Sequence, residues 1–210
     1  GQLSLKTNRK KFIYLISPNK IYKNFFRDLR LVLENKKISF FQLRLKNYSF
    51  KQKVSIGRKI KTICKKNRVK FLINDDPVLS YKLDADGCQL GQKDMDIEEA
   101  RKIIGKKIIG ITCHNSLILV KKAIKANASY IALGAFYPSK TKRVKKIADI
   151  KILKKIKRYT KIPIVAIGGI NSKNYKNLLL NNANFLAISG YSLHDGDHSS
   201  LSVEEFSLSK

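Results

Sequence analysis

Short apolar runs alternate with amphipathic segments along most of the 210-residue chain. We predict that eight of these runs are β-strands, because each is short and rich in β-branched or aromatic residues. Some of them, such as 164–167, are apolar without interruption, which is typical of strands in a parallel sheet that is covered on both faces. The predicted strands cover residues 12–17, 39–43, 70–74, 87–90, 108–112, 130–134, 164–167 and 185–189.

Helix signals lie between these strands. Asp96 followed by Glu99 resembles a capping box, and Gly105 is a suitable residue to end the helix that this box would begin. The pattern therefore predicts a helix over 97–104. Apolar residues spaced along one helical face predict further helices over 116–127 and 172–181, and a short one over 202–208.

Strand and helix alternate eight times, which predicts an α/β protein with a single (β/α)8 TIM barrel. A doubly wound open sheet is the structural alternative, and the number of strands favours the barrel. We expect a polar N-terminal extension at 1–10, the barrel and catalytic domain at 11–192, and a C-terminal tail at 193–210. No apolar run reaches the ~18 residues needed for a transmembrane helix.

Polar residues follow several predicted strands, and barrels of this kind build their active sites from such strand ends. Gln42, Arg44 and Lys46 alternate with leucines, so their side chains are expected on one side of the chain. An amide beside two cations can orient a polar heterocycle and bind phosphate. The alternative is that this polar side simply faces solvent.

Carboxylates follow the third and fourth predicted strands. Asp75 and Asp94 come from neighbouring strand ends, where together they could hold Mg²⁺, a cation that takes oxygen ligands and shares them with phosphates. Asp76 precedes Pro77, a pattern that favours a helix N-cap. We therefore assign Asp76 to structure and Asp75 to function, whereas Asp94 either shares the cation with Asp75 or only stabilises its own loop.

The later loops offer further candidates. His114 follows the fifth strand and is either a general base or a hydrogen-bonded spectator. Lys142, with Ser139 and Thr141, lies in the sixth loop, where a lysine binds phosphate or is merely solvated. The pair Gly168-Gly169 and Ser189 follow the last two strands, the usual phosphate-binding position of these barrels.

The composition is that of a folded but very basic chain, with 43% hydrophobic residues and a formal net charge of +29. Only nine of the 44 basic residues are Arg, although Arg is the residue favoured for reading bases and phosphates. We therefore interpret the charge as solvated lysine faces, and a nucleic-acid partner is disfavoured. Three widely spaced cysteines form no metal-binding or disulfide pattern and indicate reduced thiols in a cytoplasm.

Taken together, these motifs resemble those of the thiamine-phosphate synthase family, in family order and over about residues 12–191. Two departures stand out: Gln89 lies where many members have His, and residues 143–146 continue the sixth loop as a basic stretch. Thr112 and Ser139 differ from the usual residues but keep a hydroxyl. The matching stretches are 41–46, 72–75, 85–87, 91–94, 110–114, 138–142 and 167–170.

The resemblance implies a cytoplasmic transferase of thiamine biosynthesis. It would join hydroxymethylpyrimidine diphosphate to thiazole phosphate, plain or carboxylated, and release pyrophosphate. The implied cofactor is Mg²⁺ on Asp75 and Asp94. Arg44, Lys46, Thr112 and Lys142 would act on the diphosphate, and Gln42 and Asn74 would bind the pyrimidine diphosphate. The implied thiazole-phosphate site consists of Ser139, Thr141, Gly169, Ile188 and Ser189.

Two other functions remain open. A thiazole tautomerase of the same superfamily would use a base at His114, and a non-catalytic barrel would bind a phosphate ligand without turnover. The set of Gln42, Arg44, Lys46, Asp75 and Asp94 argues against the tautomerase, which needs no diphosphate site. The implied partners are small-molecule substrates, with no membrane, and an assembly of identical chains is compatible with the sequence.

Overall fold

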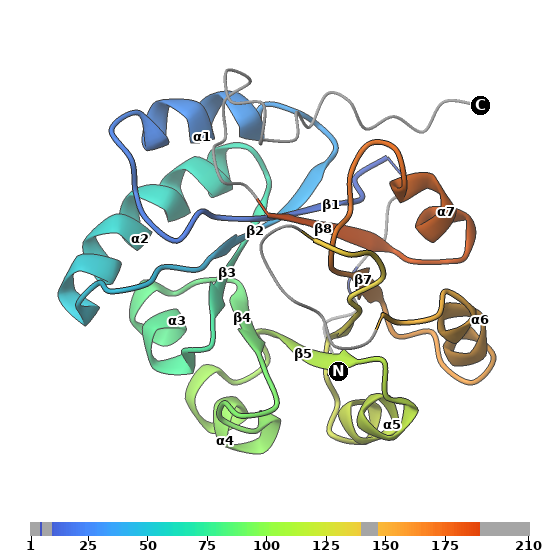
Figure 1. The fold of residues 1–210 in the computed structure, drawn as a ribbon. Coiled ribbons are helices and arrows are strands. Elements are labelled where there is room, and N and C mark those ends of the chain that lie inside the picture. The colour runs from blue at the N-terminus through green and yellow to red at the C-terminus, as the bar shows by residue number, and fades with distance from the viewer. Residues whose placement is uncertain (1–4, 6–9, 140–146, 190–210) are drawn as a thin grey trace.

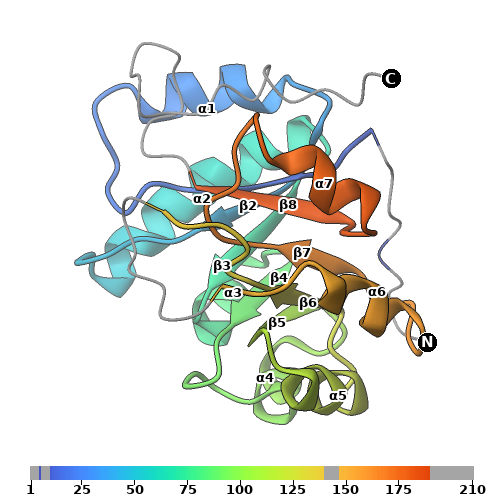
Figure 2. The ribbon, with the colours of Figure 1, turned by 45° about the vertical axis from the view of Figure 1, so that its right-hand side comes forward.

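The structure is a computed structural model that describes residues 5, 10–139 and 147–189. The described strands form a closed parallel barrel in the order β1 to β8, and the helices follow one another around its outside (Figures 1 and 2). The predicted barrel is therefore confirmed over the open sheet. The strands are β1 (Ile13–Ile16), β2 (Ile38–Leu43), β3 (Lys70–Asn74), β4 (Gly87–Leu90), β5 (Ile108–His114), β6 (Tyr130–Leu133), β7 (Ile164–Ala166) and β8 (Phe185–Ser189).

Helices occupy the connections between successive strands. They are α1 (Phe25–Leu33), α2 (Phe50–Lys66), α3 (Pro77–Leu83), α4 (Ile97–Ile104), α5 (Leu117–Lys125), α6 (Lys151–Lys157) and α7 (Tyr175–Leu180). No helix among the residues that the structure describes is long and apolar enough to cross a membrane.

Two apolar clusters lie on the two faces of the closed sheet, because alternate side chains of a strand point to opposite faces. In β2, Phe41 and Leu43 belong to the cluster between the barrel and the helices, whereas Phe40 belongs to the barrel interior. Leu5 also packs against the interior cluster, although it lies in the stretch predicted to be a polar extension. The N-terminal stretch therefore contributes at least one side chain to the barrel.

Side-chain caps fix where several helices begin. Ser49 and Gln52 form a complete capping box at α2. At α4, the Asp96 carboxylate accepts a hydrogen bond from the Glu99 N–H at 2.8 Å, and Gly105 is the C-cap, so the predicted bounds 97–104 are correct. Asp76 accepts from the Leu79 N–H at 3.0 Å, which confirms its role as the N-cap of α3.

The structure shortens two predicted helices. The expected helix at 116–127 spans Leu117–Lys125, because Ser116 is its N-cap and Asn127 takes a positive φ of 64°. The expected helix at 172–181 begins only at Tyr175, because the Asn171 side chain accepts hydrogen bonds from the Lys173 and Asn174 N–H groups and forms a turn first. The short helix predicted at 202–208 lies outside the described residues.

Replacing Asp76 with Ala removes the N-cap of α3 and is expected to lower the free energy of unfolding by about 1 kcal/mol. Urea unfolding at neutral pH measures this change. The matched control is Asp76→Asn, which should stay close to the wild type because Asn caps helices as well as Asp does. Equal midpoints for Asp76→Ala and the wild type would contradict the capping role.

Candidate active site at the mouth of the barrel

The polar residues singled out in the sequence gather at the carboxyl ends of the strands. Ile16 of β1 lies in register with Gln42 of β2 on one side and with Ser189 of β8 on the other. Closure of the barrel thus brings the second and eighth strand ends, which are far apart in sequence, to the same rim.

Asp75 is the first residue after β3 and has a left-handed backbone with a φ of 65°. Its N–H donates to the Gln89 carbonyl oxygen at 2.7 Å, and the Asn74 side-chain amide donates to its carboxylate at 2.9 Å. Non-glycine residues rarely adopt this backbone conformation, and such residues cluster at functional sites. Asp75 is therefore held in a defined position at the rim.

Asp94 lies in the loop after β4, in a tight turn. Its carboxylate Oδ2 accepts from the Gly91 N–H at 2.7 Å, and its own N–H donates to the Gly91 carbonyl oxygen at 3.2 Å. One carboxylate oxygen is thus used to hold the turn, and Oδ1 takes no part in that hydrogen bond.

The two carboxylates interact, and the pKa of Asp75 is raised to about 6. Although the residue as a whole is exposed, desolvation of its carboxylate is the largest cause, followed by the hydrogen bond to Asp94 and the negative charge of Asp94. The Arg44 cation acts in the opposite direction and favours the charged form. Asp75 and Asp94 therefore lie in contact at the mouth, and Arg44 is close enough for its charge to act on Asp75.

This acidic pair fits a hard cation that takes oxygen ligands. Among the described residues, no group of three or more His, Cys, Asp or Glu side chains comes together to enclose a metal. Mg²⁺ does not need such a group, because it usually keeps several waters and is bound through one or two carboxylates together with substrate phosphates. The two adjacent carboxylates of Asp75 and Asp94, with the positive charge of Arg44 near Asp75, suit that mode of binding.

Gln42 in β2 and the two basic residues that follow this strand lie in different environments. Gln42 is buried and points into the barrel, where its side-chain amide donates to the Tyr14 hydroxyl at 2.8 Å. Arg44 and Lys46 lie beyond the end of the strand, Arg44 half-buried and Lys46 exposed. The Arg44 N–H donates to the Ser17 hydroxyl at 2.8 Å, which ties this loop to the end of β1.

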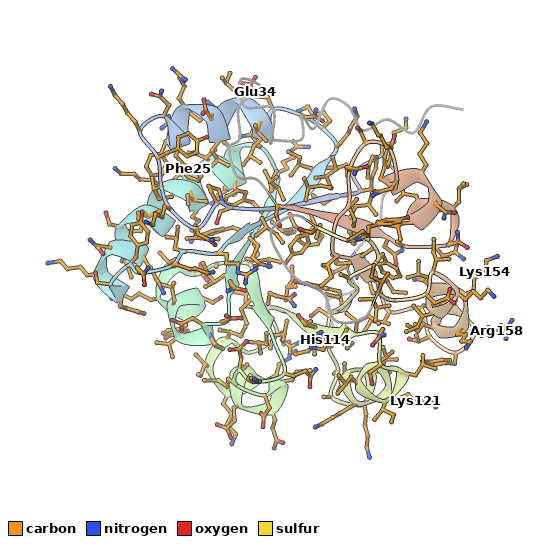
Figure 3. The ribbon with its side chains drawn as sticks, in the orientation of Figure 1. Phe25, Glu34, His114, Lys121, Lys154 and Arg158 are labelled. Atoms are coloured by element: carbon orange, nitrogen blue, oxygen red, sulfur yellow. The ribbon has the colours of Figure 1, made fainter. Side chains whose placement is uncertain are left out.

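Thr112 and His114 occupy the end of β5. The Thr112 hydroxyl accepts from the Gln89 side-chain amide at 2.8 Å, and the Gln92 amide donates to the Thr112 carbonyl oxygen at 2.7 Å. His114 is exposed and marks the end of β5 in Figure 3. The strand pairing shifts between Thr112 and His114, so β5 is irregular where it reaches the mouth.

The loops after β6 and β7 pack directly against each other. The Phe136 and Tyr137 N–H groups donate to the carbonyl oxygens of Ile167 and Gly168. Gly169 has a φ of 65°, and a Cβ atom there would lie 2.5 Å from the Tyr137 carbonyl oxygen, so only glycine fits.

The residues predicted to bind thiazole phosphate lie in different environments. Ser139 is half-buried in the loop after β6, whereas Thr141 and Lys142 lie outside the described residues. The Ile188 side chain is buried in the cluster between the barrel and the helices, so only its backbone faces the site. Ser189 is exposed at the end of β8. A turn at 171–174 separates Gly169 from α7, so the glycine pair does not lead straight into a helix N-terminus.

Comparison with known proteins decides the family. A family model described as thiamine monophosphate synthase matches residues 13–190. The chain is 65% identical over 190 residues to the thiamine-phosphate synthase of Pelagibacter ubique, covering 89% of this chain and 92% of that protein. It is 37% identical over 180 residues to the Clostridium tetani enzyme of the same name, covering 84% and 85%. The chain belongs to the thiamine monophosphate synthase family.

A solved structure supports the same conclusion. The thiamine phosphate pyrophosphorylase of Pyrococcus furiosus superposes with a TM-score of 0.78 at 29% identity, and the match covers 90% of each chain. This member of the thiamine monophosphate synthase family therefore shares both the barrel and its extent with a solved relative.

Sequence reasoning missed three buried residues of this thiamine monophosphate synthase family member. Tyr14 and Tyr130 were treated only as parts of apolar strands, and Gln89 only as a departure from the family pattern. All three lie in the barrel interior below the mouth and are joined by hydrogen bonds. The sequence does contain a signal for them. Each carries a polar side-chain group in a strand that is otherwise apolar, and a buried polar group needs a hydrogen-bond partner.

Replacing Asp94 with Asn should lower the pKa of Asp75 from about 6, because it removes the facing negative charge. The pKa should remain above the ordinary value of about 4, because desolvation persists. Carboxyl ¹³C NMR titration without divalent cations measures it. The folded protein binds an extra proton between these pKa values, so stability falls as pH rises through that window, and Asp94→Asn should weaken this fall.

The matched control is Asp96→Asn, which changes an exposed carboxylate at the N-cap of α4. It should leave the Asp75 titration unchanged. An unaltered pKa of Asp75 in Asp94→Asn would show that the two carboxylates do not interact.

Proposed function

We propose that this chain joins hydroxymethylpyrimidine diphosphate to thiazole phosphate and releases pyrophosphate. Membership of the family makes the chain a transferase of thiamine biosynthesis that forms thiamine phosphate. The observation that carries the proposed mechanism is the convergence of Asp75, Asp94 and Arg44 at one rim, beside the buried amide of Gln42.

The proposed pyrimidine diphosphate site lies over β2 and β3. Gln42 offers amide groups to the aminopyrimidine ring from inside the mouth, and Asn74 is placed beside Asp75. Arg44 and Lys46 supply positive charge to the diphosphate from the loop after β2. The structure supports Arg44 more directly than Lys46, because the positive charge of Arg44 acts on Asp75 and favours its charged form.

Asp75 and Asp94 are the proposed Mg²⁺ ligands. When bound, the cation would neutralise negative charge that develops on the leaving pyrophosphate. Hydrogen bonds from Asn74 and Gly91 fix the positions of the two carboxylates. Thr112 and Lys142 are proposed to contact the same pyrophosphate, Lys142 from outside the described residues.

The thiazole phosphate, plain or carboxylated, is proposed to bind at the rim formed by the last three strands. The close packing of the loops after β6 and β7 fixes Gly169, and the backbone of Ile188 with the Ser189 hydroxyl extends this rim. Ser139 and Thr141 belong to the same proposed site. Its position across the barrel from Asp75 would present the thiazole nitrogen to the pyrimidine carbon.

The proposed reaction breaks the carbon–oxygen bond to pyrophosphate and forms a carbon–nitrogen bond to the thiazole. The bonding electrons leave with pyrophosphate, and the aminopyrimidine ring stabilises the cation that remains. The nitrogen lone pair of the thiazole then forms the new bond. No general base is needed, because no proton is removed at the reacting carbon, and excluding water prevents hydrolysis of the cation.

The setting that we propose is the cytoplasm, with small molecules as the partners. The cysteines Cys64, Cys88 and Cys113 are free and buried, as expected where thiols remain reduced. Lys121, Lys154 and Arg158 point outward from the helices, away from the barrel (Figure 3). All three side chains are exposed, as the interpretation of the charge as solvated faces expects.

Asp75→Asn and Asp94→Asn should each lower turnover by about a hundredfold or more, because each removes a charge from the proposed metal site. The assay supplies pyrimidine diphosphate and thiazole phosphate with and without Mg²⁺, and measures thiamine phosphate and pyrophosphate. The matched control is Asp76→Asn, which keeps the helix cap one residue away. Full Mg²⁺-dependent activity in either variant would refute the metal assignment.

His114→Asn separates the synthase from the alternative tautomerase. The exposed His114 side chain at the mouth could act as a base in thiazole isomerisation. Under the proposed mechanism, the variant should keep thiamine phosphate formation within about threefold of the wild type, because no proton is abstracted. The tautomerase would be favoured if the wild type isomerised the thiazole without forming thiamine phosphate and His114→Asn lost that isomerisation.

A further inference from the structure

A chain of hydrogen bonds crosses the interior of the barrel just below the mouth. The Gln42 amide donates to the Tyr14 hydroxyl at 2.8 Å, and the Tyr14 and Tyr130 hydroxyls are 2.7 Å apart. The Tyr130 hydroxyl donates to the side-chain oxygen Oε1 of Gln89 at 2.5 Å, and the side-chain nitrogen of Gln89 donates to the Thr112 hydroxyl at 2.8 Å. The chain therefore joins two candidate substrate-binding side chains from opposite parts of the barrel.

Four of the five members of this chain are enclosed, and Thr112 at its end is half-buried. Tyr14 is 1% exposed, Tyr130 is 0% exposed, and Gln42 and Gln89 are 4% and 7% exposed. In such surroundings, a polar group that loses its partner has no water to replace it, so each hydrogen bond restricts its neighbours strongly. Burial also raises the pKa of both tyrosines, so each phenol keeps its one hydrogen.

The chain has a single direction. The Gln42 nitrogen can only donate, so the Tyr14 oxygen accepts there. Because the one hydrogen of Tyr130 is donated to Gln89, the hydrogen between the two phenols comes from Tyr14. Tyr130 donates its hydrogen to the side-chain oxygen Oε1 of Gln89, and the side-chain nitrogen Nε2 of Gln89 donates to the Thr112 hydroxyl. This sequence of donors leaves the side-chain oxygen Oε1 of Gln42 and the Thr112 hydroxyl hydrogen for other partners.

Ring packing keeps the two phenols in place. The rings of Tyr14 and Tyr130 meet edge to face with centroids 5.8 Å apart, and Phe40 contacts both rings. Tyr130 also lies directly over Gly110 of β5, where a Cβ atom would come within 1.9 Å of its ring. The hydroxyl groups therefore have little freedom to move away from each other.

We propose that Tyr14, Tyr130 and Gln89 are positioning residues that orient the Gln42 amide and the Thr112 hydroxyl through this directed hydrogen-bond chain. Gln42 is thereby set to accept a hydrogen bond from the amino group of the pyrimidine. Thr112 is set to donate one to the leaving diphosphate. This inference rests on the proposed function, and it assigns to the barrel interior a role beyond packing.

The two ends of the chain are expected to give different kinetic effects. Tyr14→Phe removes the partner of Gln42, so the KM for the pyrimidine diphosphate should rise about tenfold with a smaller change in kcat. Gln89→Met removes the donor to Thr112, so kcat should fall about tenfold with a smaller change in KM. Tyr130→Phe interrupts the middle and should produce both effects.

A double-variant series tests whether the effects pass through the chain. If Tyr130 acts through Gln42 and Thr112, then Tyr130→Phe should add little in a Gln42→Leu, Thr112→Val background. The matched control is Tyr22→Phe, which removes a phenol hydrogen bond to Asp28 outside the barrel interior. This control should change neither KM nor kcat. A full, additive effect of Tyr130→Phe in the Gln42→Leu, Thr112→Val double variant would overturn the proposal.

A readout without turnover separates this inference from the proposed function. In ¹⁵N NMR spectra, the side-chain amide hydrogens of Gln42 should exchange slowly in the wild type, and Tyr14→Phe and Tyr130→Phe should speed that exchange at least tenfold. Wild-type protein that forms no thiamine phosphate but shows this protection would refute the function alone. Unprotected Gln42 hydrogens in an active wild type would refute the chain.

Discussion

Closure of the barrel by the pairing of β1 with β8 is the constraint on which the rest of the structure depends. The strand ends that carry Gln42, Asp75, Asp94, Thr112 and Ser189 are spread over most of the sequence, and only a closed sheet brings them to one rim. Closure also creates an interior that must be filled. The lower part is filled by apolar side chains such as Phe40 and Phe185, whose rings meet edge to face.

Polar side chains join the apolar ones toward the mouth, where Gln42 lies in register with Leu72, and they prepare the mouth for a charged substrate. A fully apolar interior would leave the Gln42 amide without partners, whereas the two phenols satisfy it and transfer its orientation to Gln89. Every buried side-chain nitrogen and oxygen among the described residues has a hydrogen-bond partner. The polar layer is thus stable in the absence of substrate, which keeps reorganisation on binding small.

Electrostatics at the rim follow from the same geometry. Desolvation and the neighbouring Asp94 carboxylate raise the pKa of Asp75, while the Arg44 cation opposes that rise. An arrangement of like charges that is unfavourable alone becomes favourable when a cation and an anionic substrate are added. The many lysines are spread over helices and loops and contribute a general attraction for anions rather than a specific contact.

The sequence by itself determined the eight strands, their alternation with helices, the cap at Asp76 and the set of residues at the strand ends, because these depend on local patterns of apolar and polar residues and on short-range hydrogen bonds. It did not determine where the helices near 116 and 172 begin, since side-chain caps and turns decide this. It also could not show that the Ile188 side chain faces the helices or that Tyr14, Tyr130 and Gln89 meet inside the barrel. Those facts depend on which face of each strand turns inward and on contacts between residues more than 40 positions apart, such as Tyr14 and Tyr130, which lie 116 positions apart in the chain. Only the closed tertiary structure brings such residues together.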